Sequence, residues 1–210
     1  MLALVPQPLF SAECSNQSKN TPPRKIPNKD KRQREYLLAH EVDQLRKAVM
    51  KDNRYAVRDS TIILLMFRHA LRSAELVSLK WSQIDLKAAI IHVTRRKKGL
   101  ASSHPLTGEE LRALRMLRRA NPISPYVFIT MRGAPLTTRT VRAMIAKAGE
   151  QSGLGFPVSS HQLRHSCGYK LVNDNQNLRS IQLYMGHASI SNTTIYAQLN
   201  ANKFKNFFSD

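Results

Sequence analysis

The chain has 210 residues, 42% of them hydrophobic, so it can bury the core of one ordinary domain, and this composition argues against wholesale disorder. Its 33 Lys and Arg against 14 Asp and Glu give a formal net charge of +19, which points to nucleic acid first, or else to an anionic membrane surface or an acidic protein. The longest unbroken apolar stretch, residues 62–67, is far shorter than the roughly 20 residues that span a bilayer, which weakens the membrane interpretation.

Residues 1–35 are predicted to form a basic N-terminal arm. They contain five of the ten prolines and the run RKIPNKDKRQR, and they show no apolar period. The arm is expected either to be flexible and solvated or to lie along DNA phosphates. Its start, MLALVPQPLF, lacks the charged n-region of a signal peptide. Cys14 lies in this polar arm and Cys167 in a predicted helix, so no disulfide framework is implied and a reducing cytoplasm fits.

From residue 36 onward the apolar pattern becomes helical, and it predicts helices over residues 37–52, 56–70 and 73–86. The second of these is the most apolar and is expected to be buried. Residues 88–96 are rich in β-branched side chains and predict a strand. Gly99 then marks a turn, and a return strand is expected over residues 102–106.

The next helix is predicted to begin at a capping box formed by Thr107 and Glu110. A short strand is expected at residues 126–130. Further helices are expected at residues 137–153, closed by Gly153, and then at 159–174, 177–187 and 191–199. The fold class predicted for residues 36–210 is therefore mainly α with a small antiparallel β-sheet (α+β).

The last residues, 203–210, predict a short amphipathic helix. Phe204, Phe207 and Phe208 would lie on one side of it. The pattern by itself favours docking onto the same subunit.

Metal and nucleotide chemistry find little support in the sequence. His161 and His165 stand four apart and could share a helix face, but Arg164 between them would repel a cation. The chain has neither a Gly-x-x-x-x-Gly-Lys loop nor a Gly-x-Gly-x-x-Gly motif. We therefore predict no metal and no cofactor. Cys167 is expected to pack in a helix rather than to act as a nucleophile.

Five residues in four segments suit phosphate chemistry when they are taken together. Arginine forks hold phosphate oxygens in a fixed plane. Imidazoles donate to the same phosphate or move a proton near neutral pH. A tyrosine phenol can attack phosphorus and form a covalent link. The residues are Arg72 at a break between two helices, His161 and Arg164 on one helical face, His187 after a glycine, and Tyr196 nine residues later.

The order and spacing of these segments resemble the tyrosine recombinase (phage integrase) family. HALRSAEL is similar to the first arginine box of that family, HQLRH to the second, and MGH followed by Tyr196 to the histidine and nucleophile elements. The resemblance covers about residues 36–208, the catalytic domain of the family. KKGLASSHPL, LRHSCGY and the short chain most resemble the fimbrial phase-variation recombinases.

The resemblance implies a role for each residue. Arg72 and Arg164 would clamp the non-bridging oxygens of the scissile phosphate and stabilise the charge of the transition state. His161 would hydrogen-bond the phosphate and is a candidate acceptor for the phenol proton, and His187 would donate to the phosphate. Tyr196 would attack and leave a 3′-phosphotyrosine and a free 5′-hydroxyl, with no ATP and no metal.

Two further roles come with the resemblance. Glu75 would orient Arg72 from three residues away. The family also places a catalytic lysine in the turn between two strands, where it protonates the leaving 5′-oxygen. The sequence offers Lys97 and Lys98, and the family's spacing of eight residues before a proline, here Pro105, favours Lys97.

The implied function is inversion of a promoter segment that controls fimbrial phase variation. The expected partners are double-stranded DNA with inverted repeats, further copies of the chain in a synaptic tetramer, and accessory DNA-bending proteins. The resemblance also implies that Phe204, Phe207 and Phe208 dock into a neighbouring subunit and so couple the protomers of the tetramer. The expected place of action is the bacterial cytoplasm. The alternatives are an integrase or excisionase of a mobile element, a type IB topoisomerase, and a non-catalytic DNA-binding regulator with the same fold.

Overall fold

The computed structural model describes residues 34–51, 54–95 and 99–198. Lys97 and Lys98 lie outside these ranges, as do Cys14, the N-terminal arm before residue 34, and the tail phenylalanines Phe204, Phe207 and Phe208. What the sequence predicts for these residues stays a prediction.

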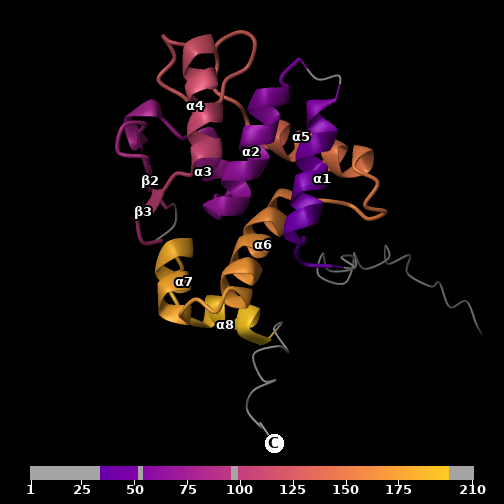
Figure 1. The fold of residues 1–210 in the computed structure, drawn as a ribbon, viewed down its shortest axis with the longest axis vertical. Coiled ribbons are helices and arrows are strands. Elements are labelled where there is room, and N and C mark those ends of the chain that lie inside the picture. Colours follow the sequence, from indigo (N-terminus) through magenta and orange to yellow (C-terminus); the bar gives the residue numbers. More distant parts are fainter. Residues whose placement is uncertain (1–33, 52–53, 96–98, 199–210) are drawn as a thin grey trace, which may run out of the picture. The chain divides into compact units, whose positions relative to one another are not determined.

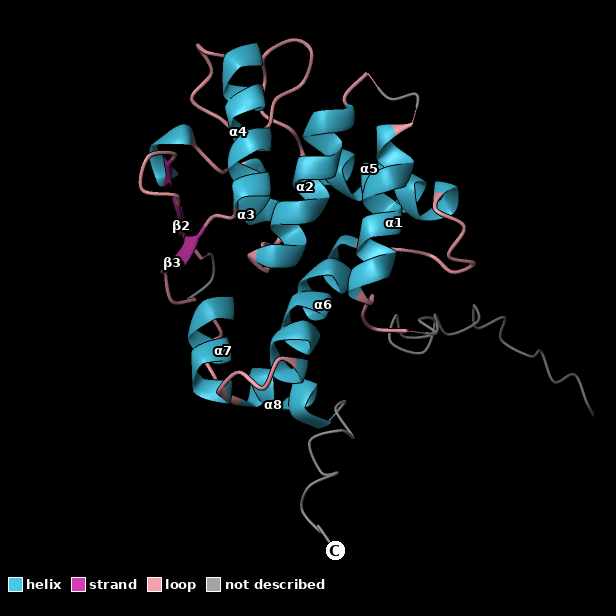
Figure 2. Cartoon of the chain, viewed as in Figure 1, coloured by secondary structure: helices cyan, strands magenta, loops and turns pink. Residues whose placement is uncertain are grey.

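The described residues form α-helices and one small sheet, which lies to one side of the helices, and this confirms the predicted fold class (Figures 1 and 2). The sheet is antiparallel, in the order β1-β2-β3, and Ile91 on the central strand pairs with Ile84 on one side and His104 on the other. The helices are α1 (Ala39–Met50), α2 (Ala56–Arg68), α3 (Ser73–Val77), α4 (Gly108–Ala120), α5 (Thr138–Gln151), α6 (Ser160–Asn173), α7 (Leu178–Met185) and α8 (Ser191–Gln198), and the strands are β1 (Ile84–Asp85), β2 (Ile90–Val93) and β3 (Ser102–Pro105).

The helix predicted over residues 73–86 ends early, and this part of the prediction is wrong. Helix α3 stops at Val77, and the chain continues through a 3-10 turn (Trp81–Gln83) into β1. The reason is a distant partner: the backbone carbonyl of Leu79 accepts a hydrogen bond from Val127 N at 3.0 Å, and Trp81 N donates to Pro125 O at 2.9 Å. Residues 126–130, predicted as a strand, make isolated bridges instead, such as the one between Lys80 and Tyr126.

The start of α4 follows the predicted capping box. The Glu110 carboxylate accepts from the backbone N–H and the hydroxyl of Thr107, both at 2.8 Å. Glu110 is buried, so this contact is shielded from solvent. The box therefore fixes the direction in which the chain enters α4 after β3.

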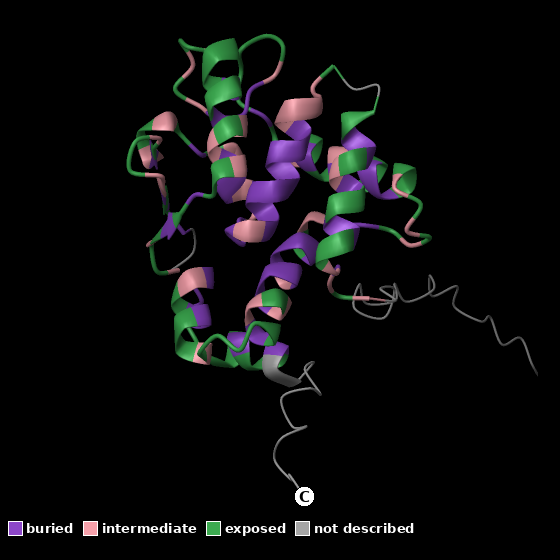
Figure 3. Ribbon diagram, in the orientation of Figure 1, coloured by how far each residue is buried: buried purple, intermediate pink, exposed green. Residues whose placement is uncertain are grey.

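Helix α2 is the centre of the main hydrophobic core. Every residue from Asp59 to Phe67 is buried, and α1, α4 and α6 pack against the helix (Figure 3). A second, smaller core joins α6, α7 and α8, and it contains Cys167, Met185 and Tyr196. Tyr196 thus packs in a hydrophobic cluster that is separate from the main core. None of the helices in the described ranges is long and apolar enough to cross a membrane.

Candidate active site

Three of the predicted residues line one cleft of about 1020 Å³. Arg72 enters it from the start of α3, and His161 and Arg164 enter from the first turns of α6. Arg142 of α5 adds a further positive charge to the wall. A cleft with this lining favours an anion that has several oxygens to share, such as a phosphodiester.

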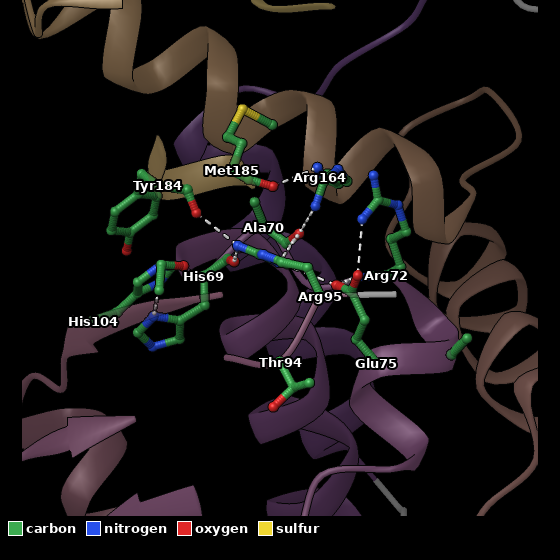
Figure 4. Close-up of polar contacts among 12 residues, drawn as sticks. His69, Ala70, Arg72, Glu75, Thr94, Arg95, His104, Arg164, Tyr184 and Met185 are labelled. Atoms are coloured by element: carbon green, nitrogen blue, oxygen red, sulfur yellow. Dashed lines mark hydrogen bonds and ion pairs between the residues drawn. The ribbon is translucent and has the colours of Figure 1, made fainter. Parts of the chain in front are cut away.

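Arg164 is held by the backbone of two turns. Its guanidinium donates to the carbonyl oxygens of Ala70 and Met185, the latter at 2.7 Å, and the residue is only 3% exposed (Figure 4). Burial, with Arg72 and Arg95 nearby, lowers the pKa of Arg164 to about 10, so the side chain stays protonated at neutral pH. The two carbonyl oxygens orient the guanidinium, and because they carry no net charge they leave its positive charge available to a ligand.

Ala70, whose carbonyl oxygen accepts from Arg164, has a left-handed backbone with φ at 51°. This conformation costs a residue with a Cβ about 1–2 kcal/mol. The turn between α2 and α3 is therefore strained where its carbonyl oxygen meets Arg164 and also Arg95, whose Nη1 lies 3.2 Å away.

Glu75 connects two arginines, Arg72 and Arg95. Its Oε1 lies 2.8 Å from Arg72 Nη1, its Oε2 accepts from the Arg72 backbone N–H at 3.0 Å, and the same Oε2 lies 3.1 Å from Arg95 Nη1 (Figure 4). Burial alone would raise the pKa of Glu75, but these hydrogen bonds and charges outweigh it and the pKa falls below its usual value. Glu75 is therefore an anion that fixes the direction of Arg72.

Arg95 is a residue that sequence reasoning missed. It follows β2, and its side chain is wholly buried although it begins the basic run RRKK. Its Nη2 donates to His69 O at 3.1 Å and to Tyr184 O at 2.7 Å. Arg95 thus joins the end of β2 to the α2–α3 turn and to the end of α7. The four basic residues of this run look alike in the sequence, so charge alone could not mark Arg95 as buried.

His187 follows the left-handed Gly186, whose φ is 64° and which ends α7. Its Nδ1 lies 2.9 Å from Thr193 Oγ1, and Thr193 is fully buried. Burial first, and then the charges of Arg164, Arg72 and Arg95, lower the pKa of His187 to about 4. His187 is therefore neutral at pH 7. Its Nε2 carries a proton for a phosphate only if the Thr193 hydroxyl donates to Nδ1.

Tyr196 lies against α6, and the residue is 2% exposed. A Cβ at Gly168 would come within 2.6 Å of the Tyr196 ring, so glycine at this helical position makes room for that ring. Burial raises the pKa of Tyr196 to about 12, although the Arg164 charge acts in the opposite direction. The phenol is protonated in this state, and its hydroxyl lies 3.1 Å from His165 Nδ1.

Two buried histidines, His69 and His104, connect three elements next to the site. His69 Nε2 lies 2.9 Å from Glu110 Oε1, and its Nδ1 lies 3.1 Å from His104 Nδ1. His104 Nε2 lies 2.8 Å from Ser102 Oγ, and its ring stacks on Tyr184 at 3.7 Å between centroids. Burial lowers the pKa of His104 to about 3. This chain of contacts ties β3 to the end of α2 and the start of α4.

The structure thus brings Arg72, His161 and Arg164 into one cleft, with the Arg164 charge acting on His187 and Tyr196. The residues that sequence reasoning missed are Arg95, Thr193 and, as the partner of the tyrosine hydroxyl, His165. Within residues 34–51, 54–95 and 99–198, no group of three His, Cys, Asp or Glu side chains is placed to hold a metal ion.

Comparisons with known proteins agree with this geometry. The model of the phage integrase family matches residues 35–203. The chain is 37% identical over 180 residues to the type 1 fimbriae regulatory protein FimB of Escherichia coli (strain K12), which covers 83% of this chain and 90% of FimB.

Solved structures show the same fold. The crystal structure of XerA recombinase is similar with a TM-score of 0.71 and 28% identity, over 82% of this chain and 63% of XerA. The XerH site-specific recombinase, bound to a palindromic difH substrate, has a TM-score of 0.69 and 20% identity over 81% of this chain and 51% of XerH. The chain therefore spans less than two thirds of either solved recombinase.

Proposed function

Because the chain belongs to the phage integrase family, we propose that it is a site-specific tyrosine recombinase that cleaves and rejoins double-stranded DNA through a 3′-phosphotyrosyl intermediate. The observation that carries the proposal is the convergence of Arg72, His161 and Arg164 on one cleft, with the charges of Arg164 and Arg72 acting on Tyr196. The family predicted from the motifs is confirmed.

In the proposed reaction the scissile phosphate enters the cleft. Arg72 and Arg164 bind its non-bridging oxygens and stabilise the extra negative charge of the pentavalent transition state. The orientation of these two guanidiniums is fixed beforehand by Glu75, Ala70 O and Met185 O, so little reorganisation is needed during the reaction.

The two histidines add donors to the same phosphate. His161 is exposed on the cleft and hydrogen-bonds a phosphate oxygen, and His187 donates from Nε2. Tyr196 attacks phosphorus, and the 5′-oxygen leaves with a proton from Lys97. The phosphodiester energy is kept in the phosphotyrosine, so rejoining needs no ATP and no metal.

The basic surface provides the remaining contacts with DNA. The whole chain has a net charge of +19. Contacts with backbone phosphates suit the basic arm before residue 34 and the exposed arginines of α4, such as Arg112, Arg115 and Arg119. Such contacts carry no sequence information by themselves, so binding should weaken steeply with salt.

We further propose that the recombinase inverts a promoter segment between inverted repeats and so switches the expression of fimbriae. The similarity to FimB, a fimbriae regulatory protein, over 90% of its length supports this role over that of an integrase or excisionase of a mobile element. The active assembly would be a tetramer on two paired DNA sites in the bacterial cytoplasm, with accessory bending proteins.

The experiment starts from the DNA that flanks the gene. Sequencing should find an invertible segment bounded by short inverted repeats, and an oligonucleotide carrying one repeat is then nicked close to the cleavage position. The purified protein is expected to form a covalent adduct on this DNA, whereas Tyr196→Phe binds the same DNA and forms none. Binding without any adduct would support the non-catalytic regulator instead.

A plasmid substrate separates the remaining alternatives. Two inverted repeats on one plasmid should yield inversion. Excision of a directly repeated segment without inversion would favour the mobile-element function. Relaxation of a supercoiled plasmid that lacks the repeats would favour a topoisomerase.

A further inference from the structure

The Tyr196 hydroxyl meets a histidine other than the one expected for proton transfer. Tyr196 Oη and His165 Nδ1 are 3.1 Å apart, a hydrogen-bond distance, and the two rings meet at 61° with centroids 5.6 Å apart. His165 lies on α6 one residue after Arg164. The phenol oxygen that must lose a proton therefore already lies at hydrogen-bond distance from an imidazole nitrogen.

His161 and His165 differ in what they face. His161 is exposed and lines the cleft with Arg72 and Arg164. A phosphate oxygen bound in the cleft would take up a hydrogen bond from the His161 ring. His165 is half-buried one helical turn later, and the two rings pack edge to face at 4.4 Å between centroids. The two histidines are thus placed for different partners, one for the phosphate and one for the phenol.

The reaction needs an acceptor at this place. At pH 7 roughly one phenol in 10⁵ is ionised when its pKa is near 12, so the attacking oxygen has to release its proton as the bond to phosphorus forms. The protonated Arg164 favours the phenolate but has no lone pair with which to accept a proton. An imidazole nitrogen that carries no proton can accept it, and His165 Nδ1 is the nitrogen at hydrogen-bond distance from the phenol oxygen.

We propose that His165 is the general base of the cleavage step and that His161 is a phosphate ligand; this inference rests on the proposed function. The Tyr196 O–H bond breaks and an N–H bond forms on His165 Nδ1, which becomes an imidazolium. The phenolic oxygen forms a bond to phosphorus while the P–O5′ bond breaks, and the 5′-oxygen leaves with the electron pair and a proton from the general acid. In rejoining, the 5′-hydroxyl returns its proton to the general acid and forms a bond to phosphorus, the P–O bond to Tyr196 breaks, and His165 gives its proton back to the departing phenol oxygen.

The test measures single-turnover cleavage of the nicked DNA by three proteins. Asn places an amide oxygen near the position of Nδ1, so His165→Asn keeps a hydrogen-bond acceptor that cannot hold a proton. We expect His165→Asn to bind DNA like the unaltered protein and to cleave at least about 100-fold more slowly. His40→Asn, at an exposed histidine of α1, is the matched control and should cleave at the unaltered rate. If His165→Asn cleaves at the unaltered rate, His165 only positions the ring and the inference is wrong.

A second measurement distinguishes proton transfer from packing. Replacing Tyr196 by a fluorinated tyrosine makes the phenol more acidic, and it should accelerate the His165→Asn protein much more than the protein that retains His165. The same replacement in His161→Asn should change the rate only as it does in the unaltered protein. An equal effect of fluorination with and without His165 would overturn the inference. His165→Gln repeats the comparison if His165→Asn does not fold, as judged by its thermal midpoint.

Failure of the inference and failure of the proposed function give different results. If the unaltered protein forms no adduct on its DNA, the proposed recombinase activity fails. If the unaltered protein forms the adduct and His165→Asn forms it equally fast, only the assignment of the base fails.

Discussion

Glu75 and Arg95 form an ion pair that is shielded from solvent: Oε2 and Nη1 are 3.1 Å apart, and the two side chains are 1% and 0% exposed. The second oxygen of the same carboxylate holds Arg72, which is 40% exposed and reaches the cleft. One buried anion thus stabilises a structural arginine and directs an arginine of the site.

Glu75→Gln is expected to lower the free energy of unfolding by about 3 kcal/mol, because it leaves the buried Arg95 charge without an anion. Urea unfolding measures this loss. Glu150→Gln, at an exposed glutamate of α5, is the matched control and should leave the stability unchanged. A Glu75→Gln protein as stable as the control would mean that the carbonyl contacts of Arg95 suffice.

Thr193 is expected to set the proton on His187. Thr193→Val removes the hydroxyl while keeping the shape of the side chain, so nothing at that position holds His187 Nδ1 as an acceptor. We expect single-turnover cleavage to slow about tenfold, the rate equivalent of one lost hydrogen bond. Thr193→Ser keeps a hydroxyl and should stay near the unaltered rate. Equal rates for the Val and Ser variants would contradict this role.

Gly168→Ala tests the place of the nucleophile. Alanine normally stabilises a helix relative to glycine by about 1 kcal/mol, but here its Cβ would overlap the Tyr196 ring. The ring must move, and a displaced nucleophile should cleave about 100-fold more slowly while DNA binding persists. Gly108→Ala, where a Cβ meets only ordinary contacts, is the control. Unchanged cleavage by Gly168→Ala would show that the tyrosine already moves before it attacks.

The stability of the fold should depend on pH through buried neutral histidines. Burial lowers the pKa of His104 to about 3 and that of His187 to about 4, from a usual value of 6.5. Between these values the unfolded chain binds protons that the folded chain excludes, so stability falls as the pH falls below 6.5. His104 alone contributes up to about 1.4 kcal/mol per pH unit in this window.

Urea unfolding at pH 7.5 and pH 5 measures this dependence. The free energy of unfolding should be lower at pH 5, and His104→Gln should reduce the difference between the two values. His40→Gln, at an exposed histidine, should not alter that difference. If His104→Gln shows the full difference, the acid sensitivity comes from other groups.

The choice between Lys97 and Lys98 can be decided by chemistry. A DNA substrate with sulfur in place of the 5′-bridging oxygen has a leaving group that needs no proton. Lys97→Ala is expected to cleave ordinary DNA poorly and this substrate well, because only protonation of the leaving oxygen has been lost. Lys98→Ala should cleave both. The reverse pattern would assign the general acid to Lys98.

Local patterns in the sequence were enough for α2 and for the boxes around Arg72 and Arg164. The apolar run of α2 can only be buried, and the boxes are short and in fixed order. The helix predicted over residues 73–86 was wrong because the hydrogen bonds of Leu79 and Trp81 go to residues 125–127, which no local pattern reveals.

Burial of charge was equally hidden. Arg95 stands in a run of basic residues, yet its partners are carbonyls of the α2–α3 turn and of α7, far away along the chain. The sequence marks His165 only as a candidate metal ligand, because its contact with Tyr196 depends on how α8 folds back onto α6.

The carbonyl of Ala70 is shared by Arg95 and Arg164. A side chain can be deleted by substitution, but a backbone oxygen cannot, so the anchor of these two cations is protected from most single-codon changes. What remains variable is the torsion of one strained peptide. Substitutions in this turn should therefore change the orientation of both guanidiniums together. The positions of Arg95 and Arg164 would then be lost, or restored by a second substitution, at the same time.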